Sequence, residues 1–193
     1  MSSSSSYNPI DGFNRENAPG NATVNGIDFD KLPPILRTLL VSDGTVTKLL
    51  EAYFWEPIQV KRLFHGEQQA AADIPALDLK QGDPVLHRRV LMCGITTGRI
   101  YSYAQSHIRA DLLWPGVRDD LVQGRLGIGE LLRGRRVETY REPLSYELTP
   151  AGELARELEV KEDDLLISRA YRIFVGGAPT IFIVDKFPIR PFS

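Results

Sequence analysis

The sequence predicts an α+β domain: an antiparallel β-sheet with helices packed on one side. Apolar runs that read as strands come in neighbouring pairs, and short glycine-containing segments at 94–98 and 176–178 join them. Hairpins make antiparallel neighbours, and such sheets commonly pack one face on helices. Arg88 and Asp185 lie inside apolar runs, where an unpaired charge is costly. We therefore expect a buried pocket for a small anionic molecule.

Length and composition predict one folded domain behind a polar tail. The chain has 193 residues, of which 42% are hydrophobic and 25% charged, as is usual for a soluble globular protein. Residues 1–26 are poor in large apolar side chains and rich in Ser, Asn and Gly. They lack the apolar area that would offset the entropy of ordering, so we expect a disordered tail at 1–26 and a single domain at 27–193.

Charge and patterning argue against several classes of protein. The net charge of −2 and the pI near 6.0 do not favour a nucleic-acid partner. No apolar run approaches the length of a membrane helix, and the N-terminus does not resemble a signal peptide. Cys93 is the single cysteine, so no internal disulfide can form. We expect a cytoplasmic protein that does not bind membranes, and a monomer because no exposed apolar stripe stands out.

The first half of the chain predicts two helices followed by three strands. Pro33-Pro34 opens a helix at 35–40, because proline is tolerated in the first helical turn. Ser42 to Thr45 offer capping oxygens to a second helix at 46–53. A strand at 56–64 and a polar loop at 66–82 follow. The first predicted hairpin then joins strands at 85–93 and 99–108.

The second half predicts three helices and three strands. Short helices are predicted at 115–123 and 129–132, followed by a charge-rich strand at 136–148. Thr149-Pro150 is expected to cap a helix that runs to about Leu158. The second hairpin joins strands at 165–175 and 179–187.

Familiar catalytic motifs are missing, which leaves the strand arginines as candidates. The sequence has no Walker loop, dinucleotide fingerprint or nucleophile elbow, and its three histidines show no metal-ligand spacing. Arg88 and Arg89 are adjacent, so one faces the interior and the other solvent. The inner arginine could form a salt bridge across the sheet or grip a carboxylate with its planar fork. Arg141 could likewise belong to a solvated strand face or to a site, and 127–129 could be a helix-start turn or aim backbone N–H groups at a ligand.

Five segments, in order, resemble the chorismate pyruvate-lyase family, especially its bacterial branch beyond the ubiquinone-pathway enzymes. They lie at 39–47, 86–94, 103–108, 126–132 and 183–188, and so span most of the predicted domain. The resemblance implies the same antiparallel fold with a buried ligand. It also implies a cofactor-independent carbon–oxygen lyase that cleaves chorismate to 4-hydroxybenzoate and pyruvate, a product that could feed quinone biosynthesis or a phenolic lipid.

The resemblance also assigns roles to individual residues. Arg88 would bind the ring carboxylate, and Asp185 would face the 4-hydroxyl end, either to hold the hydroxyl or to assist proton transfer. Independently of the resemblance, a second cation should meet the enolpyruvyl carboxylate: Arg141 is the candidate, and Lys186 is the less favoured alternative because it adjoins Asp185 and should face away. Backbone N–H groups would contribute from two places, Val46 with Thr47 and Ile128 with Gly129.

Two departures from the family pattern and a second resemblance favour an alternative. The family usually has glutamate at the position of Asp185, and many members have arginine at the position aligned with Gln105. Residues 155–188 also resemble the effector-binding domain of GntR-type transcription factors, although residues 1–30 are too short and polar for a DNA-binding module. The alternative is therefore a non-catalytic small-molecule binding protein of the same fold.

Overall fold

A computed structural model describes residues 7–8, 12–13, 23–24, 27–124 and 127–193. The tail predicted at 1–26 lies mostly outside these residues, and its described part consists of short paired strands. β1 (Tyr7–Asn8) pairs with β2 (Gly12–Phe13), and β3 (Thr23–Val24) pairs with β4 (Ile27–Asp28). Among the described residues, no helix is long and apolar enough to cross a membrane.

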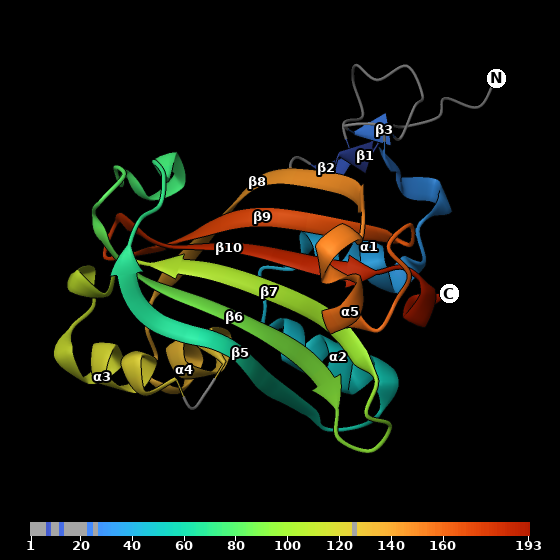
Figure 1. Ribbon diagram of the computed structural model, residues 1–193, viewed down its shortest axis with the longest axis horizontal. Helices are drawn as coiled ribbons and strands as arrows, with labels where there is room; N and C mark the ends of the chain where they lie inside the picture. The colour runs from blue at the N-terminus through green and yellow to red at the C-terminus, as the bar shows by residue number, and fades with distance from the viewer. Residues whose placement is uncertain (1–6, 9–11, 14–22, 25–26, 125–126) are drawn as a thin grey trace.

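One six-stranded antiparallel sheet forms the centre of the molecule, as Figure 1 shows. The strand order is β5-β6-β7-β10-β9-β8, so the two hairpins meet where β7 pairs with β10. The predicted α+β class and antiparallel sheet are confirmed. The strands are β5 (Ile58–Gln69), β6 (Pro84–Gly94), β7 (Ile100–Ile108), β8 (Thr139–Pro150), β9 (Leu165–Val175) and β10 (Ala178–Pro188).

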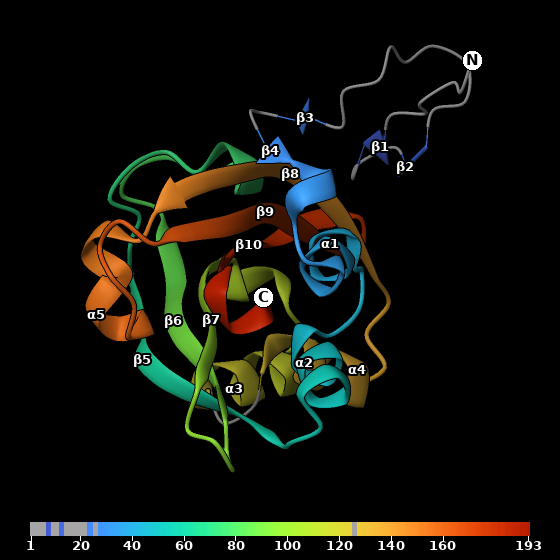
Figure 2. The ribbon, with the colours of Figure 1, turned by 90° about the vertical axis from the view of Figure 1, so that its right-hand side faces the viewer.

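The sheet curls around the longer helices, which lie on its concave face (Figure 2). These helices are α1 (Pro34–Val41), α2 (Val46–Phe54), α3 (Pro115–Gln123) and α4 (Ile128–Gly134). The four-residue α5 (Ala155–Leu158) instead packs on the convex face, where Leu158 joins Leu91 and Leu166 in a small apolar cluster. The sheet is therefore apolar on both faces, but the larger core is on the concave side.

Alternation along each strand decides which side chains enter the concave core. Successive strand residues point to opposite faces. On β10, Ile181, Ile183 and Phe187 belong to the two concave clusters, whereas Phe182 packs against the convex cluster around Leu77. Asp185 falls in the inward set of this strand and is 2% exposed.

Two predicted boundaries are wrong because strand pairing continues past them. β5 runs to Gln69, whereas the sequence predicts a loop from residue 66, and its extra residues pair with the start of β6. Thr149 and Pro150 end β8 and pair with β9, so they are not the cap of a helix. In both places the neighbouring strand supplies backbone hydrogen bonds that local residue preferences cannot anticipate.

Candidate functional site

A pocket lies between the concave face of the sheet and the N-terminal ends of α2 and α4. Its empty volume is about 580 Å³, which includes the solvent space at its mouth. Ala104 and Ser106 face it from the central strand β7, and their small side chains leave room that larger residues would fill. Val90, Ile173 and Ile183 line it from β6, β9 and β10, so much of the wall is apolar.

All seven residues predicted for the site line this pocket. Arg88 comes from β6, Asp185 from β10 and Arg141 from β8, and the others are at the starts of the two helices: Val46, Thr47, Ile128 and Gly129. These residues are up to about 140 positions apart in sequence. Three strands separate β8 from β6, and the sheet that contains them is curled (Figure 2). Arg141 of β8 and Arg88 of β6 nevertheless line the same pocket.

Arg88 is the inward member of the arginine pair. It is 3% exposed, whereas Arg89 is exposed on the convex face with its guanidinium 5.7 Å from the centre of the Phe64 ring. Burial lowers the pKa of Arg88, and the charge of Arg62 lowers it further. A carboxylate in the pocket would oppose both effects, since an opposite charge favours the protonated guanidinium.

The ends of α2 and α4 bring backbone N–H groups to the pocket. The first N–H groups of a helix lack intrahelical partners and carry a partial positive charge. The predicted side-chain cap of α2 is wrong: Thr45 is the N-cap residue but makes no capping hydrogen bond, and the Ser42 hydroxyl accepts from Gly44 N instead. Gly129 of α4 packs so closely on Thr45 that a Cβ atom there would lie 3.1 Å from its Oγ1. The two helix ends therefore form one wall.

Arg141 is half-buried at the rim of the pocket. Its Nη1 donates a hydrogen bond to the backbone carbonyl of Asp43, in the segment that leads into α2. Arg141 also borders a neighbouring hollow together with Lys48 and Arg133. Lys48 is paired with Glu51 at 2.6 Å, so Arg141 and Arg133 are the cations of this hollow that favour the approach of an anion.

Asp185 is held by two neighbours that the sequence analysis did not assign to the site. Arg169 Nε donates to Asp185 Oδ2 at 3.0 Å, and both side chains are at most 4% exposed. Tyr171 lines the pocket, and the Arg169 guanidinium lies 4.7 Å from the centre of its ring. Burial raises the pKa of Asp185, while the charge of Arg169 and hydrogen bonds from Arg169 and Tyr171 oppose that rise. Burial also raises the pKa of Tyr171, so its hydroxyl stays protonated.

One signal in the sequence could have identified these neighbours. Ile167, Arg169, Tyr171 and Ile173 alternate along β9, which puts all four on one face. Since Ile167 and Ile173 are core residues, the arginine between them must be buried and must have a partner. The partner itself depends on the pairing of β9 with β10.

Gln105 lies away from the pocket, on the opposite face of β7 from Ala104 and Ser106. Its Oε1 accepts a hydrogen bond from the Tyr103 hydroxyl at 3.3 Å. This departure from the family pattern therefore does not alter the pocket wall, in contrast to Asp185.

Comparisons with known proteins identify the family of the chain. The model of a family described as "Chorismate pyruvate-lyase Rv2949c-like" matches residues 40–191. A relative from Mycobacterium leprae, named chorismate pyruvate-lyase, is 30% identical over 171 residues, which are 86% of this chain and 80% of the relative.

Solved structures with the same fold include a domain of a transcriptional regulator. PhnF from Mycobacterium smegmatis aligns with a TM-score of 0.61 and 13% identity, over 77% of this chain and 65% of PhnF. The ligand-binding domain of a GntR-family transcriptional regulator from Bordetella bronchiseptica aligns with a TM-score of 0.54 and 15% identity, over 67% of this chain and 85% of that domain. These likenesses establish the fold, whereas the family match covers most of the chain and all seven predicted site residues. The chain belongs to the Rv2949c-like chorismate pyruvate-lyase family.

Proposed function

We propose that the protein is a chorismate pyruvate-lyase that converts chorismate to 4-hydroxybenzoate and pyruvate without a cofactor. The observation that carries the proposal is the joint presence of buried Arg88, buried Asp185 and the N-terminal end of α2 on one pocket. The family membership and the relative from Mycobacterium leprae support the same activity.

The charges of the pocket suit a substrate with two carboxylates. Arg88 would take the ring carboxylate, because a guanidinium can make two parallel hydrogen bonds to it. The N–H groups at Val46 and Thr47 would add donors to the same anion. Arg141, at the rim, would meet the enolpyruvyl carboxylate, and Asp185 would accept a hydrogen bond from the ring hydroxyl.

The reaction depends more on positioning of the substrate than on an added reagent. The ether bond between the ring and the enolpyruvyl group breaks, the ring carbon that bears the hydroxyl loses its proton, and the enolpyruvate formed takes up a proton to become pyruvate. Aromatisation of the ring drives the process. Arg88 and Arg141 would orient the substrate from its two ends, and the apolar walls would limit water, so that the charge moving in the transition state meets fixed partners.

The direct test is an assay of purified protein with chorismate. We expect 4-hydroxybenzoate and pyruvate to appear in equal amounts. Chromatography measures 4-hydroxybenzoate, and a coupled assay with lactate dehydrogenase measures pyruvate. Arg88→Ala protein is the control for uncatalysed decay of chorismate. If the wild type releases the products no faster than this control, the lyase proposal is wrong.

A second candidate is a non-catalytic small-molecule binding protein, favoured by the fold shared with the GntR-family ligand-binding domain. A thermal-shift screen separates the two candidates. Stabilisation by 4-hydroxybenzoate supports the lyase, whereas stabilisation by an unrelated metabolite, with chorismate and 4-hydroxybenzoate inert, supports the binding protein. Neighbouring genes for a prenyltransferase or a polyketide synthase would distinguish a quinone from a phenolic lipid as the later product.

A further inference from the structure

We infer that Arg169 is a positioning residue of the site. Its Nε holds the Asp185 carboxylate, and its Nη1 holds the end of α1 and the segment that leads into α2. This inference rests on the proposed function, because it assigns Arg169 a task in ligand binding. Arg169 itself does not line the pocket and so would act through its neighbours.

The contact with Asp185 orients the acid and favours its charged form. Arg169 Nε lies 3.0 Å from Asp185 Oδ2 on the adjacent strand, and the two residues are register partners of β9 and β10. A buried carboxylate alone would tend to take up a proton. With Arg169 beside it, Asp185 remains an acceptor that can receive a substrate hydroxyl, and it is a weaker base than an isolated buried carboxylate would be.

The second set of contacts reaches the end of α1. Arg169 Nη1 donates to the backbone carbonyls of Leu39 at 2.6 Å and Ser42 at 2.7 Å. The last carbonyls of a helix lack intrahelical partners, and a cation there is favourable. A residue about 130 positions away in sequence thus caps α1.

The capped end of α1 leads directly into the pocket wall. Only 42–45 separate α1 from α2, and Gly44 and Thr45 of this segment line the pocket next to the first turn of α2. Arg141 holds the same segment through the carbonyl of Asp43. A change at Arg169 should therefore disturb both Asp185 and the N–H groups of α2, although neither is beside it in sequence.

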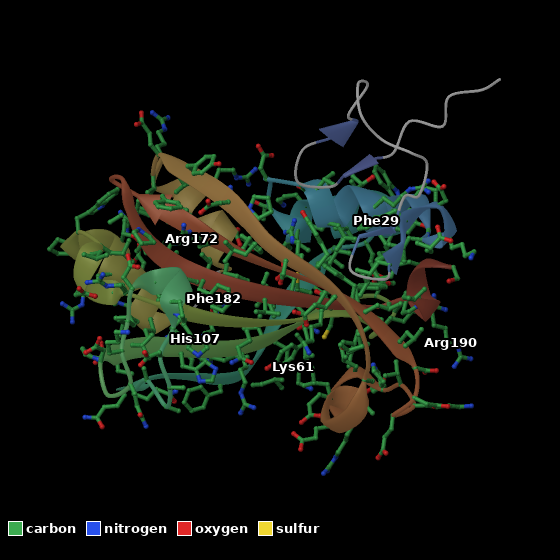
Figure 3. The ribbon with its side chains drawn as sticks, turned by 90° about the horizontal axis from the view of Figure 1, so that it is seen from above. Phe29, Lys61, His107, Arg172, Phe182 and Arg190 are labelled. Carbon is green, nitrogen blue, oxygen red and sulfur yellow. The ribbon has the colours of Figure 1, made fainter. Side chains whose placement is uncertain are left out.

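Two substitutions separate the charge of Arg169 from its geometry. Arg169→Lys keeps the charge but has one nitrogen, which cannot reach Asp185 and the carbonyls of Leu39 and Ser42 together. Arg169→Met removes both the charge and the donors. Arg172→Met is the matched control, because Arg172 is also on β9 and paired with an acid, Glu142, but on the convex face (Figure 3).

The first measurement is the pKa of Asp185, which is obtained by carbon-13 NMR on protein labelled at the aspartate carboxyl groups. The Asp185→Asn variant assigns the signal. We expect Arg169→Met to raise the pKa of Asp185 by about 1–3 units, because an opposite charge nearby lowers it by that amount. Arg169→Lys should change it much less, and Arg172→Met should leave it as in the wild type.

The second measurement is the affinity for 4-hydroxybenzoate, by calorimetry at a temperature where every variant is folded. We expect Kd to rise about tenfold or more in both Arg169 variants, since both lose the hold on 42–45, and to stay within about twofold in Arg172→Met. If Arg169 merely stabilised the fold, its substitution would lower the unfolding temperature without changing Kd or the pKa of Asp185.

The outcomes separate this inference from the proposed function. If Arg169→Lys binds 4-hydroxybenzoate as the wild type does, the positioning role is wrong. If Arg169→Met does not fold, the Kd of Arg169→Lys tests the positioning role. The Kd of the double variant Arg169→Met/Asp185→Asn, which leaves neither charge of the pair buried, is then measured beside it. If the wild type does not bind 4-hydroxybenzoate, the proposed function fails, and the effect of Arg169 on the pKa of Asp185 is still measurable.

Discussion

The two faces of the sheet carry the same kind of ion pair in different surroundings. On the concave face Arg169 meets Asp185, and their side chains are 4% and 3% exposed. On the convex face Arg172 meets Glu142, and their side chains are 25% and 36% exposed. Both pairs bridge β9 to a neighbouring strand, yet only the first borders the pocket.

The comparison shows that burial, and not the ion pair itself, decides what an arginine does here. A pair near the surface contributes little, because water screens both charges. A buried pair is costly to break, since removing one partner leaves the other charge desolvated. We therefore expect the concave pair to hold Asp185 in one position, and loss of the convex pair to have little effect on stability.

The largest expected effect is on stability. Asp185→Ala should lower the free energy of unfolding by about 3–5 kcal/mol, because it leaves Arg169 buried without its acid. Glu142→Ala should lower it by about 1 kcal/mol or less. Urea denaturation followed by circular dichroism measures both, and equal losses would contradict the contrast between the faces.

The next effect is on binding and compares the adjacent arginines of β6. Arg88→Ala should weaken 4-hydroxybenzoate binding by about 2–5 kcal/mol, or roughly 30- to 4,000-fold, as expected when one partner of a buried charged hydrogen bond is removed. Arg89→Ala, on the convex face, should bind normally. Calorimetry gives the two dissociation constants. If Arg88→Ala is unfolded while Arg89→Ala folds normally, Arg88 has a structural role instead of a binding role.

The smallest effect concerns the pH response of the convex face. His87 and His107 stack with ring centres 4.7 Å apart, and burial, with a smaller effect of His107, lowers the pKa of His87 from 6.5 to about 4. Between these values the unfolded chain binds a proton that the folded protein does not, so His87 makes stability fall as pH falls from 6.5 to about 4.

His87→Gln should make this loss of stability shallower, without changing stability at pH 8 by a comparable amount. Urea unfolding at several pH values measures the slope for the wild type and the variant. Parallel slopes would show that His87 does not contribute to the pH dependence.

Much of the fold was accessible from the sequence because it depends on local pattern. The period of two along β6 separates Arg88 from Arg89, and the glycines at 176–177 mark the second hairpin. The ends of β5 and β8 were not accessible, because their last residues are polar or turn-like and are strands only through pairing with β6 and β9.

The site was accessible in part. The predicted residues all line one pocket, since each is an inward strand position or a helix start. The alternation along β9 marks Arg169 as buried, but its partner could not be predicted because the pairing depends on a β-bulge. From the turn, Val175 pairs with Ala178 and Phe174 with Pro179, which would bring Asp185 opposite Ser168. The register shifts between Pro179 and Ile181, and Asp185 then lies opposite Arg169.

The sequence by itself determined the antiparallel sheet and the faces of its strands, while its resemblance to the lyase family implied which residues would share a site. The strand faces follow from backbone geometry, which alternates side chains along every strand regardless of what lies beside it. The tertiary structure decided the placing of Arg141 and Arg88 on one pocket, the room above Ala104 and Ser106, and the pairing of Arg169 with Asp185 and the end of α1. These depend on hydrogen-bond register and packing between distant segments, which no local pattern specifies.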